Sequence, residues 1–170
     1  MTRISVVGNH DVAALERDPS GMNPYAGAAA IWTSERLTDK SRSYLLSLGE
    51  SAKAGEASMT VHHGSLHNIS EYLYEDDVIE EMLVEAESSV LVFGHTHVPY
   101  VKEFRRGLIV NPGSVGQPRD RDPRASFGIL ETKPLSCRIV RVPYDIEGAS
   151  EAILGAGLPR ILAERLKIGF

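Results

Sequence analysis

Short apolar runs, each ending in a small polar cluster, recur four times along the chain. They cover residues 4–11 (ISVVGNHD), 59–65 (MTVHHGS), 90–97 (VLVFGHTH) and 108–114 (LIVNPGS). Runs of this length are typical of the buried strands of an α/β sheet. Because the carboxyl ends of parallel strands meet along one edge of a sheet, we expect the polar residues after these runs to form one convergent site.

Amphipathic stretches with helical periodicity separate the apolar runs. The clearest covers residues 75–86, where acidic residues crowd the first turn and Val78, Ile79, Met82 and Leu83 form an apolar stripe that predicts a core-facing helix. Further helices are predicted at 11–17, 21–32 and 40–48, and two more within 146–166, separated by Gly155, Gly157 and Pro159. Strands are predicted at 4–7, 90–93, 100–104, 108–110, 125–131 and 136–142, with a further strand in the run 59–65 and a hairpin turn at 105–107.

Composition fits one soluble domain over residues 1–170, since 170 residues with 42% hydrophobic content are enough to bury a core. A formal net charge of −5 argues against stable nucleic-acid binding. The single cysteine, Cys137, cannot form an internal disulfide, which suits a reducing cytoplasm. No run approaches the roughly 18 apolar residues of a membrane span, and the first residues lack a signal-peptide pattern, so we expect a cytoplasmic protein without a membrane association.

The histidines gather at the predicted strand ends. In an extended segment residues i and i+2 point to the same side, so His95 and His97 are placed to serve two neighbouring ions, with Thr96 pointing away. His62 and His63 should face opposite sides of their strand, so only one of them can face the site. His67 lies in a predicted loop, where ordinary exposure and contact with a substrate phosphate are both open.

Three of these clusters, GNHD, HG and GHTH in this order, resemble three of the five sequence blocks of the calcineurin-like metallophosphoesterases, in particular the small bacterial and archaeal phosphodiesterase branch. The stretch NPGSVGQPRDRDPRASFGILE at 111–131 is similar to the tail of that branch. The resemblance implies an α/β fold, namely an αββα sandwich of two mixed sheets. It also implies a hydrolase that cleaves a phosphodiester or phosphomonoester with a metal-activated hydroxide.

Residue by residue, the resemblance assigns Asn9, His63 and His95 to one metal position and His97 to the other. His63 is favoured over His62 because the glycine after it matches the HG pair. His10 is implied to act beside the scissile phosphate, as general acid or as an electrostatic clamp on the transition state. The cofactors implied are divalent ions, among which Mn, Fe, Zn, Ni and Co are all open.

One departure from the family concerns its Asp-x-His and Gly-Asp-x-x-Asp blocks, which precede GNHD in the family and are absent here. We therefore expect an N-terminally truncated domain that lacks the first β-α-β elements. One metal position is expected to keep nearly all of its ligands, whereas the other is expected to lack most of them. The chain is therefore expected to bind one ion or none, in place of the two of the family. Apolar surfaces where the lacking elements would pack are expected to be exposed, and they favour a homo-oligomer or an N-terminal complement as partner.

Arginines in the stretch QPRDRDPR at 117–124 raise the question of phosphate binding, because Arg is the preferred bidentate phosphate ligand. Asp120 and Asp122 interleave with them, so a solvated and locally neutralised loop is an equally open interpretation. Arg119 is the candidate substrate-binding residue.

Three hypotheses from different classes follow. The first, which we favour, is a metal-dependent phosphoesterase. The sequence does not indicate whether its shortened form is active or inactive. The second is a non-catalytic interaction module, since the same fold serves as a scaffold in the retromer complex. The third is the C-terminal half of a split enzyme. The natural substrate is not indicated beyond a phosphate ester.

Overall fold

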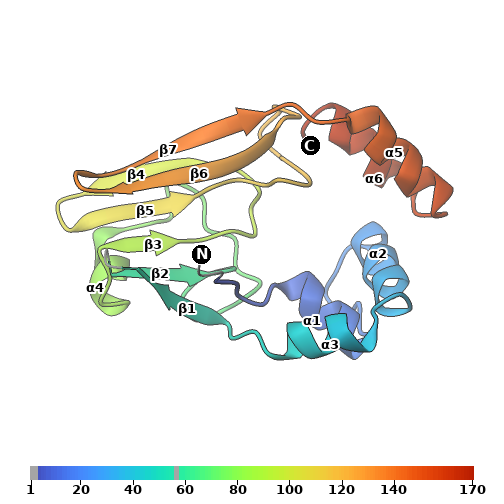
Figure 1. Cartoon of the computed structure of the whole chain (residues 1–170), viewed down its shortest axis with the longest axis horizontal. Coiled ribbons are helices and arrows are strands. Elements are labelled where there is room, and N and C mark those ends of the chain that lie inside the picture. The colour runs from blue at the N-terminus through green and yellow to red at the C-terminus, as the bar shows by residue number, and fades with distance from the viewer. Residues whose placement is uncertain (1–3, 56–57) are drawn as a thin grey trace.

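Three parallel strands form the centre of the larger of two sheets. They are β2 (Met59–His62), β3 (Val90–Val92) and β5 (Gly107–Asn111). Two antiparallel strands flank them, β1 (Ser51–Ala54) beside β2 and β4 (Tyr100–Phe104) beside β5, which gives the order β1-β2-β3-β5-β4. The structure is a computed structural model that describes residues 4–55 and 58–170 (Figure 1).

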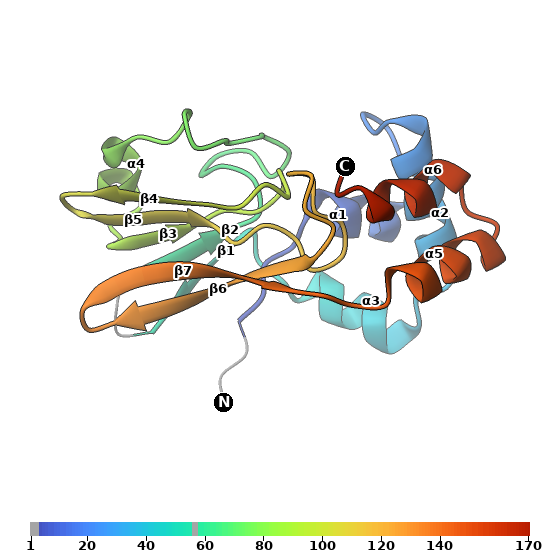
Figure 2. The ribbon, with the colours of Figure 1, turned by 90° about the horizontal axis from the view of Figure 1, so that it is seen from above.

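The smaller sheet is an antiparallel hairpin of β6 (Ala125–Thr132) and β7 (Leu135–Val142). Strand β7 packs against β4 and β5, and Figure 2 shows the hairpin as a separate layer beside the larger sheet. An α/β fold with two sheets is therefore confirmed, and the smaller sheet consists of antiparallel strands in the described residues.

Most helices gather at the end of the larger sheet toward which β2, β3 and β5 point (Figure 1). Of the helices in the described residues, α4 (Glu80–Glu85) alone lies at the opposite end. The gathered helices are α1 (Asn9–Glu16), α2 (Pro24–Ser34), α3 (Asp39–Leu46), α5 (Ile146–Gly155) and α6 (Arg160–Glu164), and α6 continues into the 3₁₀ turn Arg165–Lys167. The carboxyl edge of the parallel strands thus faces helices, as an α/β ligand site requires.

The core lies between α4, the larger sheet and the segment before α4. Its buried members are Leu73, Val78, Leu83, Leu91, Phe93, Tyr100 and Ile109. Strand β5 is buried along its whole length, as expected for a central strand with both faces covered. Val78 and Leu83 take the predicted core positions, whereas Ile79 is half exposed.

Two local predictions are wrong, and one strand was missed. Residues 4–8 form no strand, and the Val7 N–H donates instead to the Gly49 carbonyl at 3.0 Å. Strand β1 was not predicted, because its sequence SAKA has no apolar run and its conformation comes from pairing with β2. The helix predicted at 75–86 starts only at Glu80, because Asp77 accepts a hydrogen bond from the Tyr74 N–H at 2.9 Å and fixes a turn there.

Among the described residues, no helix has both the length and the hydropathy that crossing a membrane requires.

Candidate active site

The side chains of Asn9, His63 and His95 meet at one point at the carboxyl edge of the sheet. His63 Nε2 lies 2.9 Å from Asn9 Oδ1 and 3.2 Å from His95 Nδ1. An ion with bonds near 2.0–2.1 Å in tetrahedral geometry separates its ligand atoms by about 3.3 Å, so this spacing suits a single ion. In residues 4–55 and 58–170 no three His, Cys, Asp or Glu side chains form a metal site by themselves, and the triad depends on the amide of Asn9.

Each member of the triad sits at the end of a regular element. Asn9 is the first residue of α1, His63 follows β2 and His95 follows β3. Helix α1 begins here because the Gly8 N–H donates to Asp11 Oδ2 at 2.8 Å, which closes a capping interaction. A Cβ on Gly8 would lie only 3.1 Å from two atoms of the His63 ring, so the absence of a side chain at Gly8 allows the ring to approach.

Backbone carbonyls fix the tautomers of two histidines. His95 Nε2 lies 3.0 Å from the Ser70 carbonyl and His97 Nδ1 lies 2.7 Å from the Gln117 carbonyl. A carbonyl only accepts hydrogen bonds, so each of these nitrogens carries the proton. The other nitrogen of each ring, Nδ1 of His95 and Nε2 of His97, therefore keeps its lone pair for a ligand.

The GHTH segment is not extended. His95 and His97 both have φ of 61°, in the left-handed region that non-glycine residues rarely adopt. The predicted geometry, in which two histidines of an extended segment point to one side, is therefore wrong. The buried Asn111 imposes the turn, because its Nδ2 donates to the Gly94 carbonyl at 2.7 Å and to Thr96 Oγ1 at 2.9 Å. Backbone strain of this kind clusters at functional sites.

His97 stands apart from the triad. Among the described residues, no hydrogen bond joins it to Asn9, His63 or His95, although it lies close enough for the charged forms of His63 and His95 to act on its pKa. The lone pair on its Nε2 is thus a separate potential metal ligand beside the triad.

Burial keeps the site histidines neutral. It lowers the pKa of His63 to about 4, with a further contribution from His95, and it lowers the pKa of His97 to about 4, helped by the charge of Arg119. The pKa values of His10 and His95 are also lowered, chiefly by burial. Neutral imidazole is the form that binds metal ions.

Two arginines carry positive charge into the site. Arg119 donates to Gln117 Oε1 at 3.1 and 3.3 Å, and Arg165 donates to the main-chain oxygen of Phe170 at 2.7 Å. In the part of the chain that the structure describes, neither forms an ion pair with an Asp or Glu side chain. Together with His10 they line a cavity of about 190 Å³ that also contains Asn9 and His95.

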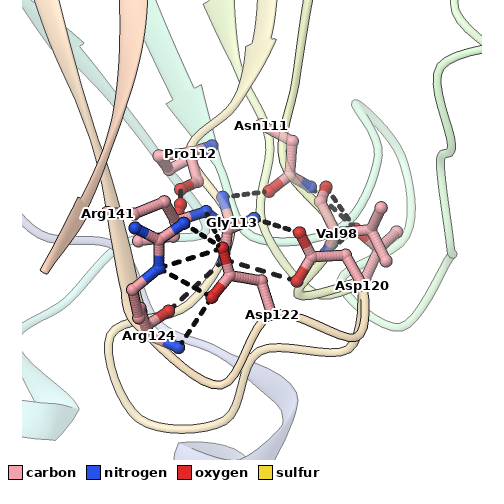
Figure 3. A network of polar contacts seen from close by, with 10 residues as sticks. Val98, Asn111, Pro112, Gly113, Asp120, Asp122, Arg124 and Arg141 are labelled. Carbon is pink, nitrogen blue, oxygen red and sulfur yellow. Dashed lines mark hydrogen bonds and ion pairs between the residues drawn. The ribbon is translucent and has the colours of Figure 1, made fainter. Parts of the chain in front are cut away.

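The interleaved aspartates neutralise other arginines. Asp122 pairs with Arg124 at 2.6 Å, and Asp120 pairs with Arg141 of β7 (Figure 3). The interpretation as a neutralised loop therefore holds for Arg124, whereas Arg119 is left facing the site.

The remaining histidines lie outside the triad. His62 packs beside Phe93, with ring centroids 6.2 Å apart, so the strand alternation separates it from His63 as expected. His67 is largely exposed and lies 2.8 Å from Glu85.

The sequence model for the calcineurin-like phosphoesterase superfamily domain matches residues 2–134. The chain belongs to this superfamily. Its membership supports a hydrolase that acts on phosphate ester bonds.

Relatives of this phosphoesterase include an archaeal and two bacterial proteins. The chain is 34% identical to the uncharacterized protein MJ0912 of Methanocaldococcus jannaschii, over 98% of this chain and 75% of that protein. It superposes on the crystal structure of a metallophosphoesterase from Sphaerobacter thermophilus with a TM-score of 0.84 at 34% identity, covering 99% of this chain and 77% of that one. The chain is also 42% identical to the phosphodiesterase YfcE of Escherichia coli over a shorter stretch of 50 residues. This stretch covers 29% of this chain and 27% of YfcE.

Three residues of this phosphoesterase's site escaped the sequence analysis. Arg165 lies in the C-terminal turn, where nothing in the sequence links it to the histidines. The Tyr72 ring lies beside the His95 ring, with centroids 4.0 Å apart and the ring planes tilted by 42°, and Tyr72 comes from a loop without a recognisable pattern. Asn111 stands in the NPGS segment, which carried the resemblance but indicated no role for this residue.

Proposed function

We propose that this chain is a metal-dependent phosphoesterase with one principal metal position formed by Asn9, His63 and His95. The observation that carries this proposal is the contact of His63 Nε2 with both Asn9 Oδ1 and His95 Nδ1. Three potential metal-ligand atoms from separate elements converge there, and none of them belongs to a carboxylate.

The donor set suits a borderline divalent ion. Imidazole nitrogen binds Zn, Cu, Fe and Ni well, and the amide oxygen of Asn9 adds a neutral third donor. When bound, such an ion would polarise a phosphate oxygen and lower the pKa of a coordinated water. The free Nε2 of His97 would serve a second ion beside the first.

His10 would handle a proton at the leaving oxygen of the ester. It is the second residue of α1, next to Asn9, and shares the cavity with Arg119 and Arg165. Burial and the charge of Arg119 lower its pKa, so the free ring is neutral near pH 7. A bound phosphate anion would raise that pKa again, which favours His10 as the donor of a proton or a hydrogen bond to the departing group.

Arg119 and Arg165 would hold the phosphate itself. Guanidinium groups present planar pairs of N–H donors that match phosphate oxygens, and two of them facing one cavity without Asp or Glu partners among the described residues favour an anionic ligand. Residues Asn9, His63 and His95 would then lie on one side of the phosphate and the arginines on another.

The test is turnover by the purified chain. With Mn²⁺ or Zn²⁺ it should hydrolyse bis(p-nitrophenyl) phosphate or p-nitrophenyl phosphate, and a chelator should abolish the reaction. The His10→Ala and His63→Ala variants should lose most of this activity, roughly a hundredfold or more. His62→Ala is the matched control, because it removes the neighbouring histidine that packs beside Phe93 instead of facing the triad. No turnover together with no bound metal would reject the proposal and leave the non-catalytic module.

A further inference from the structure

A second, larger cavity adjoins the candidate phosphate position. It has a volume of about 530 Å³ and shares His10, Ala26, Arg119 and Arg165 with the smaller cavity. Volumes of this size are typical of small-molecule sites. The two cavities thus form a polar compartment and an adjacent extension.

The extension lies between helices from opposite ends of the chain. One wall carries Ala26 and Ala29 of α2, and the other carries aliphatic side chains of the C-terminal segment, among them Ile153, Leu162 and Leu166. Both views show α2 next to α5 and α6 (Figures 1 and 2), and the Trp32 Nε1–H donates to the Ala156 carbonyl at 3.2 Å, which joins the two walls. This hydrogen bond therefore links α2 to the residue that follows α5, and both helices border the space.

Besides the shared His10, Arg119 and Arg165, the polar side chains of Gln117 and Tyr144 line the larger cavity. Tyr144 lines the cavity, and its hydroxyl is buried without a hydrogen-bond partner among the described residues. A buried hydroxyl without a partner costs free energy, which a polar atom of a ligand would recover. Mostly apolar walls with a few polar groups are the usual composition of a ligand pocket.

We propose that this extension binds the organic group of the phosphate ester and that it favours a bulky apolar group, such as an aromatic ring, over a small one. The inference rests on the proposed function for the position of the phosphate, held at Arg119 and Arg165. From there the organic group has an apolar path past Ala26 into the larger cavity. The geometry therefore points to aryl or similarly apolar phosphate esters as the substrate class.

Binding of phosphonates, which cannot be hydrolysed at the phosphorus–carbon bond, tests the preference without turnover. Isothermal titration of the metal-loaded protein should show phenylphosphonate binding about tenfold or more tightly than methylphosphonate, because the ring is removed from water in the extension. Inorganic phosphate serves as the reference for the shared anionic group. Equal affinities for the two phosphonates, or no binding of either, would overturn the inference.

A cavity-filling variant locates the effect. Ala149→Leu adds bulk to the extension from α5 and should remove most of the advantage of phenylphosphonate while methylphosphonate binding stays unchanged. Ala28→Leu, an exposed alanine of α2 beside a different cavity, is the matched control and should bind both ligands like the unmodified chain. A phenyl preference that survives Ala149→Leu in a folded protein would place the ring elsewhere and reject the extension as its site.

The outcomes also separate this inference from the proposed function. Turnover without a phenyl preference would keep the phosphoesterase and remove the aryl pocket. A phenyl preference sensitive to Ala149→Leu, in a protein that turns over no ester, would keep the pocket and remove the catalytic proposal.

Discussion

The ring of His63 lies directly against the backbone at Gly8. A Cβ at this position would lie 3.1 Å from two ring atoms, so Gly8→Ala should push the imidazole away from Asn9 and His95. We expect the affinity for Zn²⁺ to fall about tenfold, as for other substitutions that misplace a metal ligand. Isothermal titration measures it, with Gly155→Ala as control because a Cβ there has nothing within 4 Å. An unchanged affinity would show that His63 is not a ligand.

His63 and His97 should make the stability of the metal-free protein depend on pH. The fold lowers both pKa values from the ordinary 6.5 to about 4, chiefly by burial, so between these values the unfolded chain binds more protons than the folded one. Stability is then fully present above about pH 6.5 and falls as the pH is lowered toward 4. Urea unfolding in the presence of a chelator should show this decline, and the double variant His63→Gln/His97→Gln should show a flatter one. Identical slopes would contradict the burial of these rings.

The limits of sequence reasoning at the residue scale are visible in the GHTH segment. Proximity of His63 and His95 followed from their places after two parallel strands, and the structure brings them to 3.2 Å. The left-handed backbone at His95 did not follow, because Asn111 imposes it from 16 positions further along the chain. Local periodicity carries no information about such a tertiary hydrogen bond.

At the scale of elements, apolar runs predicted the strands from β2 onward, whereas the apolar run at 4–7 forms no strand and β1 has no such run. Strands β4 to β7 start and end within two residues of the predicted bounds. Their own residues show the alternating or continuous apolar pattern that is typical of strands. Strand β1 has only small and charged residues and exists through its ladder with β2. The contribution of α6 and the following turn to the site depends on how the C-terminal segment packs, which no local pattern specifies.

The loop that carries Arg119 is fastened to β7 by Arg141. This guanidinium is only 15% exposed and pairs with Asp120, and it also lies 3.9 Å from Asp122 (Figure 3). Arg141→Lys keeps the charge but loses the fork of donors. We therefore expect KM for p-nitrophenyl phosphate to rise roughly fivefold with little change in kcat, since Arg119 would be positioned less well.

Steady-state kinetics checks this expectation, and Arg138→Lys on the same strand is its control. Arg138 is exposed and forms no ion pair within the described residues, so that variant should behave like the unmodified chain. A kcat that falls while KM stays constant would instead mean that Arg141 acts on the chemical step.

At the scale of the whole molecule, the triad joins parts of the chain that are far apart in sequence. Asn9 and His63 are separated by 54 positions and His63 and His95 by 32. Asn9 begins helix α1, whereas His63 and His95 follow strands β2 and β3. An ion held by all three would tie the helical end to the sheet. Because such an ion binds only the folded arrangement, it should raise the free energy of unfolding as well as support catalysis.

The size of that gain can be stated in advance. A free metal concentration one hundred times the dissociation constant should add about 2.7 kcal/mol, less whatever the histidines of the unfolded chain bind. Urea unfolding with Zn²⁺ and with a chelator measures the difference. It should vanish in His95→Ala and persist in His62→Ala, because only the first removes a member of the triad. If His95→Ala kept the full gain, the ion would bind elsewhere and the convergence of the three side chains would be a packing feature alone.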